Sequence, residues 1–238
     1  MSSLTSVLKN LSLTQTLFKR RLNDKKAHER KENVIYVTDL LYCPLKPKLR
    51  ERFRELTYAE SYNPSTLQGS LIHESVERIL REELNAEVEV PISKEIVIGD
   101  QTYTILGRAD AIKDNVIIEV KTSRADVGIP RSEHVLQVRI YLNLINSDPK
   151  WNNRSVQNRT YYGVLLYITP DRVTEFHIED GISDDELSGL VQDFLYARDT
   201  PKQEWECEYC VFDRVCPNKV SLHGAKRVGR GDNDAIPL

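Results

Sequence analysis

Two carboxylates and one ammonium group fall close together in the middle of the chain, in a pattern that would hold a divalent cation against a phosphodiester. Glu119 and Lys121 belong to the apolar run at residues 116–121, which is typical of a strand covered on both faces. Side chains alternate along a strand, so Glu119 and Lys121 project from the same face. Asp110 lies in the preceding predicted strand, and a turn at residues 114–115 brings it close to Glu119.

A lone Glu-x-Lys in a strand is most often an ion pair that reaches water at the strand end. Here further residues accompany it. Gly107 completes a Gly-x-x-Asp sequence, and Gly69 stands four residues before His73 in a predicted helix. Gln137 and Tyr141 are four residues apart in another predicted helix, so they share one face. His73 alone would be an ordinary packed or surface imidazole, and the weight of the pattern therefore lies in the combination.

The four cysteines form a second candidate site, with one early and three late residues: Cys43, Cys207, Cys210 and Cys216. In an extracellular chain they would fit two disulfides, but no signal peptide or long apolar span is visible. We therefore expect a reducing, cytoplasmic setting and no membrane. A Cys-x-x-Cys with a third cysteine nearby and a fourth far away is typical of a four-thiolate metal site. Zinc and an iron–sulfur cluster both fit this spacing.

The motifs Gly-x-x-x-His, Gly-x-x-Asp, Glu-x-Lys and Gln-x-x-x-Tyr occur in that order, and the series resembles the RecB-like branch of the PD-(D/E)xK nuclease superfamily. The resemblance covers roughly residues 38–217. One early cysteine followed by a late cysteine trio resembles the CRISPR-associated Cas-four family in particular. This resemblance implies an α/β (α+β) fold: a restriction-endonuclease-like mixed central sheet flanked by helices, with a helical iron–sulfur lobe built from the N- and C-terminal segments.

The resemblance also implies catalytic roles. His73, Asp110, Glu119 and the backbone carbonyl of Val120 would bind Mg²⁺ or Mn²⁺, because oxygen ligands suit hard cations and one nitrogen ligand makes Mn²⁺ acceptable. Lys121 would orient or deprotonate the attacking water, or stabilise charge that develops on the phosphate.

Gln137 and Tyr141 would support this site or contact the DNA. For the four cysteines, the resemblance implies a 4Fe–4S cluster first, a 2Fe–2S cluster second and zinc third, in a structural role. Trp205, Tyr209 and Phe212 would shield such a cluster from solvent.

The implied activity is metal-dependent cleavage of DNA, as an exonuclease on single-stranded ends. Its task would be to trim DNA before capture as a CRISPR spacer, alongside the Cas integrase complex. Two alternatives stay open. One is a RecB-like nuclease of DNA repair or recombination, and the other is a non-catalytic DNA-binding module on the same scaffold.

The composition excludes a uniformly basic nucleic-acid-binding coat, because the 238 residues carry a net charge of −3. Binding to DNA would then depend on local basic patches at residues 19–26, 46–54 and 226–230, each of which is also explained as a solvated face. Tyr58 and Tyr62 lie next to the second patch and would stack on unpaired bases or pack in the protein.

Four segments are expected: an N-terminal helical segment at 1–60 that contributes Cys43, a nuclease core at 61–200, a cysteine module at 201–223 and a flexible tail at 224–238. The proline-rich sequence after Cys43 departs from the family and blurs the start of the next helix. Predicted helices cover 3–30, 47–55, 64–84, 132–146 and 183–198, and predicted strands cover 34–37, 88–98, 102–113, 116–121, 160–169 and 173–178.

Overall fold

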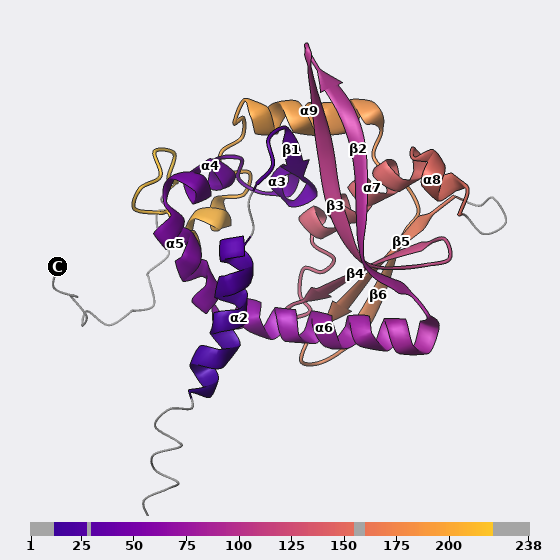
Figure 1. Ribbon diagram of the computed structural model, residues 1–238, viewed down its shortest axis with the longest axis horizontal. Coiled ribbons are helices and arrows are strands. Elements are labelled where there is room, and N and C mark those ends of the chain that lie inside the picture. The colour runs from indigo at the N-terminus through magenta and orange to yellow at the C-terminus, as the bar shows by residue number, and fades with distance from the viewer. Residues whose placement is uncertain (1–11, 28–29, 155–159, 221–238) are drawn as a thin grey trace, which may run out of the picture.

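The computed structural model describes residues 12–27, 30–154 and 160–220, and the structural statements that follow refer to them. Its centre is a six-stranded mixed sheet (Figure 1). The strands along the sheet are β1 (Val34–Tyr36), β3 (Gln101–Lys113), β4 (Val116–Thr122), β5 (Tyr162–Ile168) and β6 (Val173–Ile178), and β2 (Glu87–Ile98) pairs with β3. The predicted mixed sheet is therefore confirmed.

Three antiparallel hairpins (β2–β3, β3–β4 and β5–β6) and two parallel pairings (β1–β3 and β4–β5) make the sheet mixed. Strands β2 and β3 are antiparallel over most of their length and meet at Gly99, whose φ of +61° suits a tight turn. Strands β3 and β4 meet at the predicted turn, where Lys113 lies opposite Val116. Their ladder ends at Ala111 and Ile118, so the segment that carries Asp110 separates from the segment that carries Glu119. Strand β4 instead continues in parallel beside β5.

Three long helices pack on the sheet: α6 (Pro64–Leu84), α7 (Ser132–Asn146) and α9 (Asp184–Leu195). The Asn63 side chain accepts hydrogen bonds from two backbone N–H groups of the first turn of α6, and Pro64 fits the first helical position. Helix α9 starts at a capping box formed by Ser183 and Glu186. Helix α6 contacts β2, β3 and β4, whereas α7 contacts β2, β4, β5 and β6.

The core lies between α7 and the sheet. Its fully buried side chains include Ile105, Ile117, Leu144 and Leu165. Gly163 on β5 lies so close to Val138 of α7 that any Cβ at this position would collide with it. Helix α7 is thereby brought close to the sheet, and its side chains reach the strands that carry the candidate catalytic residues.

The N-terminal helices α2 (Leu13–Ala27), α3 (Val37–Leu41), α4 (Leu45–Arg52) and α5 (Arg54–Ala59) precede α6. Figure 1 shows α2, α4 and α5 together at one side of the sheet, with the C-terminal segment of the described chain next to them. The Lys202 ammonium group donates a hydrogen bond to the backbone carbonyl of Leu40 (2.5 Å). Segments from both ends of the described chain are therefore in direct contact.

Some local predictions are wrong. The prolines after Cys43 do not blur the next helix, because α4 begins at Leu45 directly after Pro44 and carries Pro47 in its first turn. Backbone N–H groups of a first helical turn have no partner within the helix, so a proline there removes no hydrogen bond. Leu71 and Leu84 of α6 are about half exposed, so these two leucines are not part of its buried face.

Parts of the predictions lie outside the described residues: the helix at 3–11 and 28–29, the tail at 224–238 and the basic patch at 226–230. Within the described ranges, no helix combines the length and the apolar composition needed to cross a bilayer.

Candidate active site

The Asp110 carboxylate links three elements. Its Oδ2 accepts a hydrogen bond from the backbone N–H of Val120 on β4 (2.7 Å) and lies 3.4 Å from Nδ1 of His73 on α6. The β3–β4 ladder has already ended at this point, so the side chain takes over the role of a strand carbonyl in pairing the N–H of Val120. Asp110 is thus fixed beside both the helix and the strand that carry other candidate residues.

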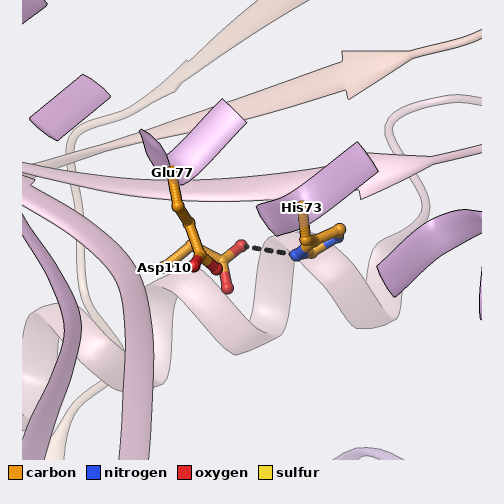
Figure 2. A group of neighbouring side chains, drawn as sticks. All are labelled: His73, Glu77 and Asp110. Carbon is orange, nitrogen blue, oxygen red and sulfur yellow. Dashed lines mark ion pairs between the residues drawn. The ribbon is translucent and has the colours of Figure 1, made fainter. Parts of the chain in front are cut away.

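Helix α6 contributes a residue that the sequence reasoning missed. His73, Glu77 and Asp110 each offer a potential ligand atom, and these atoms lie within 4.8 Å of one another. Figure 2 shows the three side chains turned toward one another, with His73 and Glu77 on successive turns of the helix. Glu77 is buried, with 9% of its surface exposed. The available signal was its position four residues after His73, which puts both side chains on one helix face.

Glu119 and Lys121 form an ion pair, with Oε1 and Nζ 2.5 Å apart. The prediction that both side chains project from one face is therefore confirmed. The Glu119 side chain is 3% exposed, and its second oxygen, Oε2, is buried without a hydrogen-bond partner within the described chain. Glu119 is not a member of the group formed by His73, Glu77 and Asp110, although it lies within electrostatic reach of Asp110 and His73.

Two acids of the site, Glu77 and Glu119, have raised pKa values. Burial raises the pKa of Glu119, and the charge of Asp110 raises it further, against the opposing effect of Lys121. Burial and the neighbouring carboxylates of Glu89 and Asp110 raise the pKa of Glu77 to about 7. Burial lowers the pKa of Lys121, but its carboxylate neighbours outweigh burial and the net shift is upward. The metal-free site thus has an excess of negative charge.

This donor set fits a divalent cation. Carboxylate oxygens suit Mg²⁺ and Mn²⁺, and an imidazole nitrogen suits Mn²⁺. The buried, unpaired Oε2 of Glu119 is the most direct sign, because an unsatisfied carboxylate oxygen is costly in a protein interior unless another group binds it.

Gln137 and Tyr141 lie behind the site and are buried, with 5% and 2% of their surfaces exposed. The Gln137 amide donates a hydrogen bond to the Tyr141 hydroxyl (2.8 Å), and this hydroxyl donates to the backbone carbonyl of Arg108 (3.1 Å). A Cβ at Gly107 would collide with the Tyr141 ring, so this glycine provides the space for it. Burial favours a supporting role over direct contact with DNA.

The four cysteines are free and line one pocket beside α4. Glu206 also lines it: its carboxylate accepts hydrogen bonds from the backbone N–H of Cys43 (2.8 Å) and of Gln203 (3.1 Å). Burial raises the pKa of the Cys43 and Cys210 thiols, so a positive metal centre would be needed to hold them as thiolates. Four converging thiols fit either a cluster or zinc.

The predicted aromatic shield of this pocket is wrong. Tyr209 is 79% exposed and Trp205 is 38% exposed, so neither side chain covers the pocket as a buried wall would. Phe212 is fully buried but does not line the pocket. The apolar part of the lining comes instead from Leu49 and Pro201.

Comparison with known proteins agrees with this geometry. The profile of the PD-(D/E)XK nuclease superfamily matches residues 82–217, and the chain belongs to this superfamily. It is 37% identical over 214 residues to the CRISPR-associated exonuclease Cas4 of Saccharolobus solfataricus, which covers 88% of this chain and all of that relative. Within the superfamily, the chain is thus a CRISPR-associated exonuclease of the Cas4 type.

A solved structure supports the same assignment. The crystal structure of SSO0001 is similar with a TM-score of 0.80 and 36% sequence identity, and the likeness covers 89% of this chain and 99% of that one. The predicted family, the central mixed sheet with flanking helices and the nuclease activity are therefore confirmed.

Proposed function

We propose that this chain cleaves single-stranded DNA from its ends with Mg²⁺ or Mn²⁺, and that it trims DNA for capture as a CRISPR spacer. The observation that carries the proposal is the position of Asp110, which contacts both His73 and the backbone of Val120. The name of the Saccharolobus relative, a CRISPR-associated exonuclease, favours the CRISPR task over DNA repair. Because that task ends in integration of the DNA, the partner would be the Cas integrase complex.

His73, Asp110, Glu119 and the carbonyl of Val120 would hold the cation. When bound, the cation would polarise a phosphoryl oxygen and acidify a water. Asp110 is already anchored by the Val120 N–H, so its position needs little adjustment. The free Oε2 of Glu119 would gain a partner that it lacks in the metal-free chain.

Lys121 would have two tasks. In the metal-free chain its ammonium group neutralises Glu119 at 2.5 Å. In cleavage, the same ammonium group would orient the attacking water or stabilise charge on the phosphate. Gln137 and Tyr141 would act as positioning residues, because they hold the backbone two residues before Asp110 and do not reach the surface.

The cysteine pocket would hold an iron–sulfur cluster, with 4Fe–4S preferred to 2Fe–2S, and zinc as the third choice. Cys43, Cys207, Cys210 and Cys216 would be its ligands. We propose the boundaries accordingly: residues 1–60 and 201–223 form the cluster lobe, and residues 61–200 form the nuclease core. The hydrogen bond from Cys43 to Glu206 supports a lobe formed from both ends of the chain.

The test is cleavage of end-labelled single-stranded DNA by the anaerobically purified chain with Mn²⁺. We expect Lys121→Ala to reduce the rate by about a hundredfold or more, on the scale of a lost general base or charge stabiliser. Lys113→Ala is the matched control, because Lys113 lies in the same hairpin with a partly exposed side chain and should cleave at the wild-type rate. Wild-type cleavage by Lys121→Ala would refute the catalytic assignment. The absence of cleavage by wild type would favour the non-catalytic alternative.

A further inference from the structure

Glu77 is buried beside the candidate metal site without a basic partner of its own. Its neighbour Glu89 pairs with Arg108 (2.5 Å), and Glu119 pairs with Lys121. Glu77 makes no ion pair with a lysine or arginine within the described part of the chain. A buried carboxylate without a cation is expensive, and an outward-facing position on the same helix would have avoided the cost.

The neighbours of Glu77 add to its negative surroundings. Glu89 lies on β2 where the ladder to β3 omits one pair, opposite Asp110, and it takes a left-handed backbone conformation with a φ of +54°. This conformation is uncommon for a residue other than glycine. The Glu89 carboxyl group contributes to the raised pKa of Glu77. The site thus contains four carboxyl groups, from Glu77, Glu89, Asp110 and Glu119. Only two permanently charged cationic side chains, Arg108 and Lys121, pair with members of this set within the described residues.

We propose that Glu77 is a ligand residue of the divalent cation and binds it jointly with His73 and Asp110. The three ligand atoms lie within 4.8 Å of one another, close enough to share one ion. A divalent cation would also offset the excess of carboxyl groups over lysine and arginine side chains around Asp110. The inference rests on the proposed function, because it adds Glu77 to the cation site assumed there.

The unpaired oxygen of Glu119 points to the same ion independently. It is 97% buried by side chain, has no hydrogen-bond donor within the described residues, and senses the charges of Asp110 and His73. Two acids near Asp110 thus have an uncompensated carboxyl oxygen: Glu77 makes no ion pair with lysine or arginine within the described residues, and Oε2 of Glu119 has no hydrogen-bond donor there. Glu77 would contribute cation affinity and rigidity, whereas Lys121 would remain the group that acts on water or phosphate.

The first measurement is Mn²⁺ binding without DNA, followed through the electron paramagnetic resonance signal of free Mn²⁺. We expect Glu77→Gln to weaken binding by about tenfold or more, because a neutral amide replaces an anionic ligand of nearly equal size. Glu82→Gln is the matched control: it makes the same change on the same helix at an exposed side chain. Its affinity should stay within about twofold of wild type, a difference well below 1 kcal/mol.

Thermal unfolding distinguishes a ligand from a structural residue. In chelator-treated buffer, Glu77→Gln should be at least as stable as wild type, because it relieves repulsion with Glu89 and Asp110. With saturating Mn²⁺, its Tm should rise less than that of wild type, since a ligand that binds only the folded state stabilises it. A lower Tm without metal together with an undiminished Mn²⁺ shift would overturn the inference.

The two proposals fail separately. If Glu77→Gln binds Mn²⁺ as tightly as wild type while Lys121→Ala abolishes cleavage, the ligand role of Glu77 is refuted and the nuclease proposal stands. If Mn²⁺ binding is weakened by Glu77→Gln but the wild-type chain cleaves no DNA, the cation site stands and the nuclease proposal is refuted.

Discussion

The hydroxyl of Tyr141 donates a hydrogen bond to the backbone carbonyl of Arg108, with 3.1 Å between the two oxygens. This contact ties helix α7 to strand β3 two residues before Asp110. The Gln137 amide in turn donates to the same hydroxyl, so the Gln-x-x-x-Tyr motif acts as one hydrogen-bonded unit. The geometry of the metal site thus depends on a helix that contributes no ligand to it.

Removal of this hydroxyl should affect both stability and catalysis. Tyr141→Phe leaves the Arg108 carbonyl unpaired in the interior, and we expect the free energy of unfolding to fall by about 1–3 kcal/mol in urea titrations. Displacement of Asp110 should reduce cleavage by about ten- to a hundredfold. Tyr103→Phe is the control, since the Tyr103 hydroxyl bonds only to the exposed Gln101 amide. Equal effects of the two substitutions would contradict the positioning role.

The requirement for glycine at position 107 can be tested by adding a single methyl group. Gly107→Ala places a Cβ against the Tyr141 ring and 3.0 Å from Cγ2 of Val37, so we expect a loss of about 1–3 kcal/mol from overpacking. Gly189→Ala in α9 is the contrasting control. Its Cβ meets no atom within 4 Å, and alanine in a helix interior should stabilise the chain by about 0.5–1 kcal/mol. Thermal and urea unfolding should therefore show a decrease in stability for Gly107→Ala and an increase for Gly189→Ala.

We expect the partly buried His134 side chain to lower the stability of the protein in acid. The Tyr167 hydroxyl accepts the N–H of Arg131 (3.0 Å) and is hydrogen-bonded to Nδ1 of His134 (2.5 Å), and a neutral imidazole satisfies the latter contact. Burial, with help from Lys121 and Arg131, lowers the pKa of His134 to about 3. In the unfolded chain, His134 takes up a proton near pH 6.5, whereas in the folded chain it stays neutral until about pH 3. The contribution of His134 to the free energy of unfolding is therefore constant above pH 6.5 and falls as the pH is lowered from 6.5 toward 3.

Replacement of His134 should reduce this acid sensitivity. A single proton taken up only on unfolding contributes about 1.4 kcal/mol per pH unit to the slope of stability against pH. His134→Gln should remove up to this amount from the slope between pH 6 and pH 4, measured by urea unfolding at each pH. His177→Gln, at a side chain that is 63% exposed, should leave the slope unchanged. An unaltered slope in His134→Gln would show that the imidazole is protonated in the folded chain.

We expect Glu206 to be needed for retention of a metal in the cysteine pocket. Both of its oxygens accept backbone N–H groups, including that of Cys43. An amide has one acceptor oxygen, so Glu206→Gln leaves one N–H unpaired and should loosen the Cys43 segment by about 1–3 kcal/mol. We expect less iron per chain after anaerobic purification. Glu208→Gln, at an exposed side chain one position before Tyr209, should retain the wild-type content.

Features encoded by local sequence were predictable. The helix Ser132–Asn146 and the strand Val173–Ile178 have the predicted bounds, because apolar periodicity and flanking turn residues specify them. The ion pair of Glu119 with Lys121 follows from strand alternation alone. Helix α9 ends at Leu195 and is shorter than predicted, since helix ends are weakly encoded when no glycine or proline marks them.

Features that depend on packing between distant segments were not predictable. Glu77 belongs to a helix rich in glutamate, and its burial becomes apparent only when α6 lies against β2 and β3. The role of Gly107 requires the Tyr141 ring from another helix. Likewise, Tyr209 follows a cysteine closely but points to solvent, because the fold of the short cysteine segment decides the side-chain directions.

The bond between the Cys43 backbone and the Glu206 carboxylate spans 163 positions of the chain. A ribosome delivers residues in order, so the N-terminal cysteine emerges long before the carboxylate that fixes it. The sheet can therefore be completed during synthesis, whereas the cysteine pocket closes only when the last segment has left the ribosome. Any metal that binds in this pocket would therefore be loaded late, and a chain truncated before the last segment would keep its sheet but lack the complete pocket.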